Sequence, residues 1–346
     1  MTDAAEARAL TRKDFSSGLA VRWCPGCGDY AILAQVQQTL PKLGIPRENF
    51  VIVSGIGCSS RFPYYMNTYG IHSIHGRAPT LATGLKCARP DLQIWVVTGD
   101  GDSLAIGGNH FLHALRRNVD INILLFNNRI YGLTKGQYSP TSELGKRTKS
   151  SPDGSIENPM NPIGVAIGAE ASFIARTVDR FQKHMSDVLL RAAEHPGATL
   201  VEIAQNCLIF NDGAWNHLTD PDSKTENVLF LEHGQAMRFG KNRGKGIRLN
   251  GLKPEVVDVA QVGEENLLVH DEKAEEPTMA YFLSRMGPPN FPTPVGVFRS
   301  VHKPIYDQLL MEQVRAAEAR QAPDVNALYH QGQTWEVTSI ENQGDT

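Results

Sequence analysis

Residues 94–102 read IWVVTGDGD, an apolar run that ends in a glycine–aspartate turn. Such a short, continuous apolar run suits a strand that is buried on both faces of a parallel sheet. Similar runs occur at residues 50–53, 121–126 and 199–204, and each ends in turn-forming or polar residues. The repetition of this pattern predicts several buried parallel strands.

The segments between these strands carry helical apolar spacing. Predicted helices cover residues 29–40, 103–117 and 180–194, and Asp29 is placed as the N-cap of the first. Alternating strands and helices predict an α/β fold with a mostly parallel, doubly wound sheet. Ligands of such sheets bind at the carboxyl ends of the strands, where every motif described below falls.

The GDGD turn at residues 99–102 is followed, after one predicted helix and one strand, by Asn127-Asn128-Arg129-Ile130. This spacing places the Asp100 carboxylate and the Asn128 amide on neighbouring strand ends. With the Ile130 carbonyl they provide the oxygen ligands that Mg²⁺ prefers. The glycines and the following helix N-terminus suit a phosphate group. The pattern resembles the thiamine diphosphate signature, GDG followed by NN, and a plain strand–helix turn is the alternative.

The composition excludes several classes of protein. The 346 residues are 41% hydrophobic and 21% charged, which is enough apolar material for a sizeable core. The net charge of −3 gives no nucleic-acid footprint, and no run of 18 apolar residues predicts a membrane span. The N-terminal MTDAAEARALTRKDF lacks the apolar core of an export signal. We therefore expect a cytoplasmic protein.

The chain has five cysteines, a small and odd number. In a protein without an export signal, this number does not indicate a disulfide framework. Cys24 and Cys27 form a C-x-x-C motif, and Cys58 and Cys207 each follow a predicted strand. The four could meet at the strand ends and hold a [4Fe–4S] cluster or a zinc ion. Disulfide exchange, or two plain buried thiols, are the alternatives for the C-x-x-C motif. Cys87 lies within a predicted helix and is expected to be a small buried residue.

Together these motifs resemble the β subunits of the 2-oxoacid:ferredoxin oxidoreductases. The resemblance covers roughly residues 15–225 and rests on WCPGCG at 23–28, GIGCSSRFP at 55–63, HGRAPTLATGLK at 75–86, GDGD at 99–102, NNRIYGLTKGQYSPT at 127–141, and Cys207. It implies a thiamine diphosphate-binding fold, a [4Fe–4S] cluster on Cys24, Cys27, Cys58 and Cys207, and Mg²⁺ on Asp100, Asn128 and Ile130. Contacts to thiamine diphosphate are implied for Gly55, Ile56, Gly57, Cys58, Ser59, His75, Gly101, Asp102, Gly132, Leu133 and Thr134.

The resemblance also implies an activity. It is the coenzyme A-dependent oxidative decarboxylation of a 2-oxoacid, or the reverse carboxylation, with electrons passed to ferredoxin. In this family the sequence LTKGQ, here at residues 133–137, is associated with members that accept 2-oxoglutarate or a broad range of 2-oxoacids. Lys135 could pair with the second carboxylate of 2-oxoglutarate.

We therefore expect 2-oxoglutarate as the substrate, with pyruvate or a broad range of 2-oxoacids as the alternative. Two other classes stay open. One is a non-oxidative thiamine diphosphate enzyme, such as a decarboxylase or transketolase, with a structural zinc. The other is a zinc- or thiol-based binding module without catalysis.

Thiamine enzymes use a glutamate against the aminopyrimidine, and no matching glutamate motif precedes GDGD in this chain. The resemblance implies that an α subunit supplies it, in an αβ or α2β2 assembly. Residues 1–225 are predicted to form the cofactor domain, and residues 226–346 a loop-rich extension that packs on the core or the partner. The polar segment 140–162 is expected to be a functional loop or a mobile segment.

Overall fold

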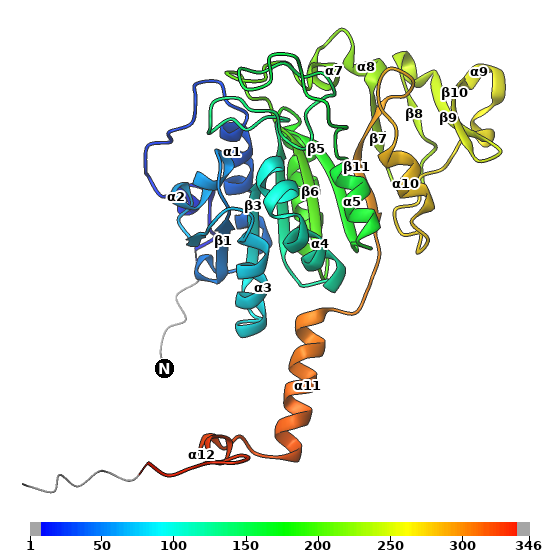
Figure 1. Ribbon diagram of the computed structural model, residues 1–346. Coiled ribbons are helices and arrows are strands. Elements are labelled where there is room, and N and C mark those ends of the chain that lie inside the picture. Colours follow the sequence, from blue (N-terminus) through cyan, green and yellow to red (C-terminus); the bar gives the residue numbers. More distant parts are fainter. Residues whose placement is uncertain (1–7, 338–346) are drawn as a thin grey trace, which may run out of the picture. The chain divides into compact units, whose positions relative to one another are not determined.

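The computed structural model describes residues 8–337 and places them in two units, residues 8–307 and 308–337. The first unit is built on an eight-stranded sheet (Figure 1). Neighbouring strands are parallel except that β11 runs antiparallel to β5. In spatial order the strands are β2 (Tyr69–His72), β1 (Phe50–Ser54), β3 (Gln93–Gly99), β4 (Asn122–Asn127), β6 (Thr199–Ala204), β5 (Phe173–Val178), β11 (Thr293–Ser300) and β7 (Val228–Leu231).

Helices cover both faces of this sheet. On one face α1 (Asp29–Thr39) packs beside α6 (Gln182–Glu194) over strand residues such as Trp95. The other face carries its own core, in which residues such as Val96 meet a second set of helices. That set is α3 (Ala78–Ala88), α4 (Gly108–Arg117), α5 (Pro162–Gly168) and α10 (Thr278–Ser284). The shorter helices are α2 (Phe62–Tyr65), α7 (Asn216–Thr219), α8 (Lys224–Asn227) and α9 (Val259–Val262).

The predicted doubly wound α/β architecture is confirmed, and β1, β3, β4 and β6 match the predicted strands to within one or two residues at each end. The sequence pattern did not reveal β2, β5, β7 or β11. All four residues of β2 are exposed, so this strand has no apolar run. In β5 the apolar run is interrupted by Arg176, whose Nε donates to Glu202 Oε2 on β6 at 2.8 Å.

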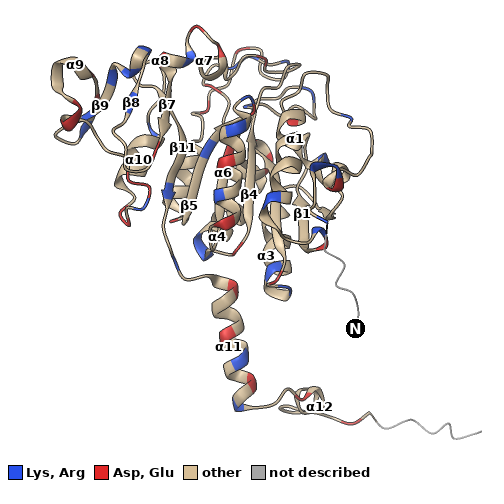
Figure 2. Ribbon diagram, turned by 180° about the vertical axis from the view of Figure 1, so that it is seen from behind, with Lys and Arg blue, Asp and Glu red and all other residues tan. Residues whose placement is uncertain are grey.

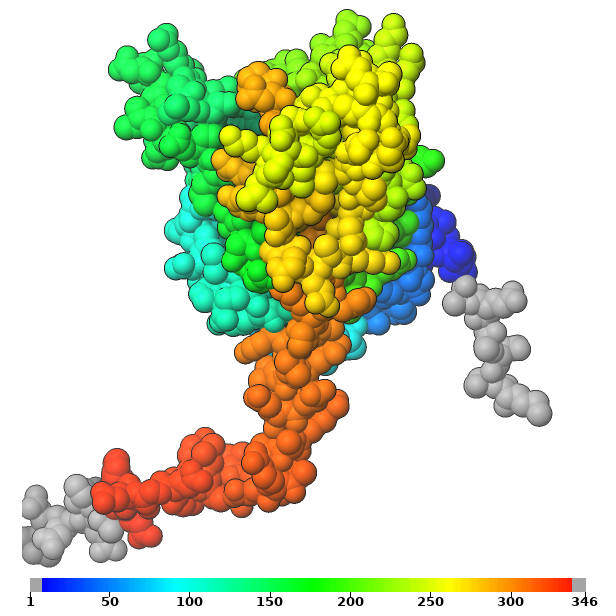
Figure 3. Space-filling view, turned by 90° about the vertical axis from the view of Figure 1, so that its right-hand side faces the viewer, coloured from blue at the N-terminus to red at the C-terminus, as the bar shows by residue number. Residues whose placement is uncertain are grey.

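Strands β7 and β11 lie beyond residue 225 but belong to the main sheet, so the sequence-based boundary falls inside the first unit. Backbone hydrogen bonding to β5 ties β11 to the core. Between β7 and β11 the chain forms a small antiparallel sheet of β8 (Arg238–Phe239), β9 (Lys245–Asn250) and β10 (Lys253–Asp258), whose yellow residues cover much of the face in Figure 3.

Helix α11 (Tyr306–Arg320) crosses the boundary between the units, and α12 (Val325–Tyr329) belongs to the second. Residues 1–7 and 338–346, which end the two predicted domains, lie outside the described residues. The first of these stretches also holds the start of the segment judged to lack an export signal.

Two helix predictions are corrected. The helix expected at 103–117 is divided, because a π-helical turn (Asp102–Ile106) precedes α4. Such turns occur frequently at functional sites. Asp29 does not cap α1; Gly28 takes that position, and the Asp29 carboxyl is buried in the first turn.

Charged residues of both signs are interspersed over the view in Figure 2. Among the described residues, no helix combines the length and the apolar character needed to cross a membrane.

Burial of a histidine makes the fold sensitive to acid. His195 is 8% exposed, its Nε2 lies 2.9 Å from Ser172 Oγ, and burial together with nearby His302 lowers its pKa to about 4. Between pH 6.5, the ordinary pKa of histidine, and pH 4, the unfolded chain therefore binds a proton at His195 that the folded chain does not bind. The free energy of unfolding decreases as the pH is lowered through this range.

We expect His195→Gln to reduce the loss of unfolding free energy between neutral pH and about pH 4.5 by on the order of 1 kcal/mol. Urea denaturation at both pH values measures it, with exposed His330→Gln as the control. An unchanged pH dependence in His195→Gln would contradict the assignment.

Candidate functional site

A cavity of about 110 Å³ opens at the carboxyl ends of β1, β3 and β4. It gathers most of the residues that the sequence motifs singled out, although they come from four separate segments of the chain. The predicted residues in its wall are Ile56, Gly57, Cys58, Ser59, His75, Asp100, Gly101, Asp102, Asn128, Ile130, Gly132, Leu133 and Thr134. Gly55, Lys135, Cys24, Cys27 and Cys207 are not part of that wall.

Asp100 provides a buried carboxylate at the end of β3. It accepts hydrogen bonds from Ser139 Oγ at 2.5 Å and Thr141 Oγ1 at 2.6 Å. Burial raises its pKa to about 6, although the hydroxyl donors oppose that shift. Among the described residues no lysine or arginine pairs with it. A buried carboxylate without a cationic partner is the setting in which a bound Mg²⁺ compensates the charge.

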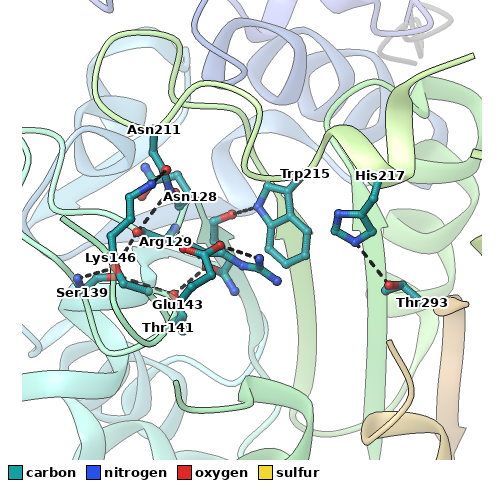
Figure 4. Close-up of polar contacts among 12 residues, drawn as sticks. Asn128, Arg129, Ser139, Thr141, Glu143, Lys146, Asn211, Trp215, His217 and Thr293 are labelled. Carbon is teal, nitrogen blue, oxygen red and sulfur yellow. Dashed lines mark hydrogen bonds and ion pairs between the residues drawn. The ribbon is translucent and has the colours of Figure 1, made fainter. Parts of the chain in front are cut away.

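The Asn128–Ile130 turn is clamped from outside (Figure 4). Arg129 takes a left-handed conformation, with φ 57°, and its guanidinium carbon lies 3.6 Å from the centre of the Trp215 ring. Arg129 Nη1 also donates to Glu143 Oε1 at 2.8 Å. Asn211 Nδ2 donates to the Asn128 carbonyl at 2.9 Å. These contacts fix the turn that follows β4.

Inside the turn, Asn128 Oδ1 accepts the Ile130 N–H at 3.1 Å. The Ile130 carbonyl accepts no hydrogen bond from the described residues. Both oxygens are therefore held in a defined place at the cavity wall, and they keep lone pairs with which to meet a cation.

Asp102 shapes the cavity. Its carboxylate accepts hydrogen bonds from the Ile56 N–H (3.1 Å), the Gly76 N–H (2.8 Å) and Thr98 Oγ1 (2.8 Å). His75 Nδ1 lies 2.6 Å from Asp102 Oδ1. A β-carbon on Gly55 would stand only 1.8 Å from Asp102 Oδ2, so glycine is required there. Asp102 thus joins the loops after β1 and β2 to the end of β3.

Ser59 supplies a polar group that has no hydrogen-bond partner among residues 8–337. Its hydroxyl is buried and forms no hydrogen bond, although the residue lies in the cavity wall. A buried hydroxyl without a partner is costly in free energy, and a phosphate oxygen of a bound cofactor would satisfy it.

Cys27, Cys58 and Cys207 lie near one another beside the cavity, and Cys24 lies near Cys58. A β-carbon on Gly132 would stand 3.5 Å from Cys58 Sγ and 3.6 Å from Cys207 Sγ. Burial, and then the neighbouring Asp29, Cys207 and Cys58, raise the pKa of the Cys27 thiol. Burial is also the main cause that raises the pKa of Cys58 to about 12, and Cys24 is among its neighbours. Cys87 lies apart from them on α3 and is half-buried rather than buried.

Cys27, Cys58 and Cys207 are partly buried thiols with raised pKa values, so they resist ionisation and take the thiolate form when a metal centre binds. Cys24 is exposed. Among residues 8–337, no group of three or more His, Cys, Asp or Glu side chains is placed to hold a single metal ion. Trp23 helps to position the thiols. Its ring packs against other aromatic rings, and its Nε1 donates to the Cys58 carbonyl at 2.7 Å.

Known proteins resemble this chain both over the cofactor-binding segment and over nearly its whole length. Residues 55–203 match the family described as "Thiamine pyrophosphate enzyme, C-terminal TPP binding domain". The chain is 52% identical over 330 residues to "2-oxoglutarate oxidoreductase subunit KorB" of Mycobacterium tuberculosis, covering 94% of this chain and 88% of the relative. The chain belongs to the β subunits of the 2-oxoacid:ferredoxin oxidoreductases.

Two further relatives agree with this membership. "2-Oxoglutarate synthase subunit KorB" of Archaeoglobus fulgidus is 43% identical over 54% of this β subunit and 69% of its own length. A solved structure, the 2-oxoglutarate:ferredoxin oxidoreductase from Magnetococcus marinus with 2-oxoglutarate, coenzyme A and succinyl-CoA bound, superposes with a TM-score of 0.76. It is 32% identical and covers 95% of this chain and 98% of its own.

Lys135 of this β subunit lies at the tip of a tight turn between Tyr131 and Gln137. Tyr131 N–H donates to the Gln137 carbonyl at 2.9 Å, and Lys135 N–H donates to the Gly132 carbonyl at 3.0 Å. Lys135 itself is exposed and has a left-handed φ of 76°. Its neighbour Thr134 lines the cavity. The turn therefore carries the lysine at the rim and not inside.

Sequence reasoning missed several residues of the site. Asp29 lines the cavity, and burial followed by the charge of Asp179 raises its pKa to about 7. Tyr131 donates from its hydroxyl to the Gly101 carbonyl at 3.2 Å, and burial raises its pKa to about 12. Asp29 directly follows the WCPGCG motif and Tyr131 lies inside NNRIYGLTKGQYSPT, so their positions close to Cys27 and Ile130 were the available signal.

The polar segment 140–162 contributes to the site through its first residues. Ser139 and Thr141, just before and within it, hold Asp100 as described above. Farther along, the segment folds back on itself, with Gly145 N–H donating to the Ser155 carbonyl at 2.8 Å and Met160 N–H to the Pro140 carbonyl at 2.8 Å. No apolar periodicity marks these contacts, so sequence analysis gave only the expectation of a functional or mobile loop.

Proposed function

We propose that this chain is the β subunit of a 2-oxoglutarate:ferredoxin oxidoreductase. The assembled enzyme would convert 2-oxoglutarate and coenzyme A to succinyl-CoA and carbon dioxide, or catalyse the reverse carboxylation, with two electrons exchanged with ferredoxin. One observation carries the proposal. Asp100, Asn128 and Ile130 line one cavity at the carboxyl ends of the strands, and Gly132, in the same wall, lies beside Cys58 and Cys207.

In this proposal Asp100, Asn128 and the Ile130 carbonyl hold Mg²⁺, and the Ser59 hydroxyl meets the diphosphate. Backbone around Gly57, Gly101 and Gly132 can approach the cofactor closely because it carries no side chain. When bound, thiamine diphosphate supplies the electron sink for decarboxylation. The remaining predicted contacts are Ile56, Cys58, His75, Leu133 and Thr134, which line the cavity, and Asp102 and Gly55, which shape it.

Cys24, Cys27, Cys58 and Cys207 hold one [4Fe–4S] cluster, which supplies one-electron transfer to ferredoxin. The donor chemistry supports this, because Cys27, Cys58 and Cys207 lie near one another and Cys24 lies near Cys58. The backbone amides of Phe210, Ile209 and Asn211 oppose the rise in the pKa of the Cys207 thiol that burial causes. Asn211 N–H donates to the Cys207 carbonyl at 2.9 Å. A structural zinc with a non-oxidative activity is the competing assignment.

An α subunit completes the binding site of the cofactor. A cavity of about 110 Å³ is smaller than the roughly 300–1,000 Å³ of typical ligand pockets, so it takes only part of the cofactor. Its carboxylates are Asp29, Asp100 and Asp102, and no glutamate lines it. We therefore propose that the α subunit supplies the activating glutamate in a cytoplasmic αβ or α2β2 enzyme.

A 2-oxoacid panel with viologen reduction, run anaerobically on the co-expressed α and β chains, tests the proposal. We expect coenzyme A-dependent reduction with 2-oxoglutarate as the preferred acid, and brown protein that contains iron and acid-labile sulfide. Equal rates with pyruvate and other acids would assign a broad-range enzyme. Colourless, zinc-only protein would overturn the oxidative assignment.

Lys135→Ala tests the choice of substrate in the same assembly. The lysine sits at the rim beside Thr134, where its ammonium can pair with the distal carboxylate that 2-oxoglutarate has and pyruvate lacks. We expect KM for 2-oxoglutarate to rise on the order of tenfold, as for loss of a charged hydrogen bond, and KM for pyruvate to change little. Equal changes for both acids would remove this role from Lys135.

A further inference from the structure

The amide of Gln205 lies directly behind one cysteine of the four. Gln205 follows β6, is 1% exposed, and its Nε2 donates to Cys27 Sγ at 3.3 Å. The same nitrogen donates to the Asn206 carbonyl at 2.8 Å. Because a carbonyl can only accept, this second bond fixes which end of the amide is the nitrogen. The N–H group therefore faces the sulfur.

Gly28 has no side chain, and this leaves the space in which Gln205 reaches Cys27. A β-carbon on Gly28 would stand 3.0 Å from Gln205 Cγ and 2.1 Å from Asp179 Oδ2. Gly28 N–H in turn donates to the Asn206 carbonyl at 3.1 Å. The glycine that ends the WCPGCG motif thus lets the segment 205–206 pack closely against the C-x-x-C loop.

Backbone amides also act on the thiols of Cys27 and Cys207. The Asp29 amide lowers the pKa of Cys27, and the three amides named above lower the pKa of Cys207, in each case against the effect of burial. Among the donors described at these two sulfurs, Gln205 is the one that belongs to a side chain. A single substitution can therefore remove it and leave the backbone donors in place.

Hydrogen bonds to ligand sulfurs are one of the protein's means of setting the reduction potential of an iron–sulfur cluster. A donor N–H stabilises negative charge on sulfur, and a cluster carries one more negative charge when reduced. The donor therefore raises the potential. Asp29, buried nearby, has the opposite influence when it is ionised, because its charge disfavours the Cys27 thiolate.

We propose that Gln205 is a positioning residue that raises the reduction potential of the cluster through its hydrogen bond to Cys27 Sγ. The inference rests on the proposed function, because it requires the cluster on the four cysteines. It adds a residue outside the ligand set that controls how readily one electron enters the cluster from an external reductant and leaves to an acceptor.

The test is a redox titration with dithionite, followed by electron paramagnetic resonance, on the αβ enzyme carrying Gln205→Met. Methionine matches glutamine in length but has no donor. At fixed applied potential we expect the ratio of reduced to oxidised cluster to fall on the order of tenfold, which is a shift of about 59 mV to more negative potential for one electron. Gln37→Met is the matched control, since buried Gln37 Nε2 donates only to the Tyr65 carbonyl.

The outcomes separate this inference from the proposed function. Wild-type enzyme without iron and sulfide would overturn the proposed function itself. An intact cluster with the wild-type potential in Gln205→Met would overturn the role of Gln205. If that variant loses its cluster, Gln205→Asn decides, because the shortened amide cannot reach Cys27 Sγ and should give the same negative shift; an unchanged potential there overturns the role.

Discussion

Cys207→Ser in the co-expressed αβ enzyme is expected to lose its iron–sulfur cluster and with it all viologen reduction. Cys207 Sγ lies against Gly132, and the Cys207 carbonyl accepts from Asn211 N–H at 2.9 Å, so the residue is held in place for ligation. A serine hydroxyl is a hard donor that stays protonated, and it does not replace a soft thiolate on iron. Iron and acid-labile sulfide should fall on the order of tenfold.

Thiamine diphosphate binding reports whether the Cys207→Ser protein is folded. The metal-binding oxygens belong to the ends of β3 and β4, and Cys207 is not part of the cavity wall, so affinity for the cofactor should stay near that of the wild type. Cys87→Ser, on α3 and apart from the four cysteines, is the control and should keep both iron and cofactor. Loss of both iron and cofactor in Cys207→Ser would indicate misfolding and not lost ligation.

Asp100→Asn is expected to have the opposite effect, weakening cofactor binding while the iron–sulfur cluster is retained. The amide can still accept from Ser139 and Thr141, but it brings no negative charge to the cation. We expect Mg²⁺-dependent binding of thiamine diphosphate to weaken on the order of 100-fold, because hard divalent ions depend on carboxylate ligands in a buried site. Calorimetric titration of the αβ enzyme with the cofactor at fixed Mg²⁺ measures this.

The cluster should survive the Asp100 substitution, since the cysteines belong to the segments around Cys27, Cys58 and Cys207 and the hydrogen bonds of Asp100 go to Ser139 and Thr141. Asp91→Asn, at an exposed pair with Arg89, is the control and should bind the cofactor like the wild type. Wild-type affinity in Asp100→Asn would remove Asp100 from the metal site and leave the GDGD motif a turn.

Local patterns predicted a large part of this protein. The four buried strands were visible because each buries both faces, which requires an unbroken apolar run. The strand β2 and the interrupted β5 were not visible, because one is exposed and the other carries Arg176 to pair with Glu202. The boundary expected at residue 225 failed to account for β11, since joining the sheet beside β5 depends on hydrogen bonds that a local pattern does not encode.

The same contrast holds at the candidate site. Sequence analysis found Asp100, Asn128 and the four cysteines because the residue type alone shows that carboxylate, amide and thiol groups can bind metals. The role of Asp29 was misread as a cap, because only the folded chain puts it against Asp179 and the cavity. Ser139 and Thr141 gave no signal, since hydroxyl groups become carboxylate donors only where the loop carries them to Asp100.

The sequence by itself determined the donor atoms, the parallel α/β order and the family, because side-chain chemistry and apolar periodicity are local properties of the chain. Tertiary structure decided which groups are buried, which are paired and which hydrogen bonds surround the sulfurs. The contact between Gln205 and Cys27 joins residues 178 positions apart. Such a contact exists only when the sheet brings β6 beside the C-x-x-C loop, and hydrogen bonds, electrostatic shifts and steric fit all depend on that distance in space.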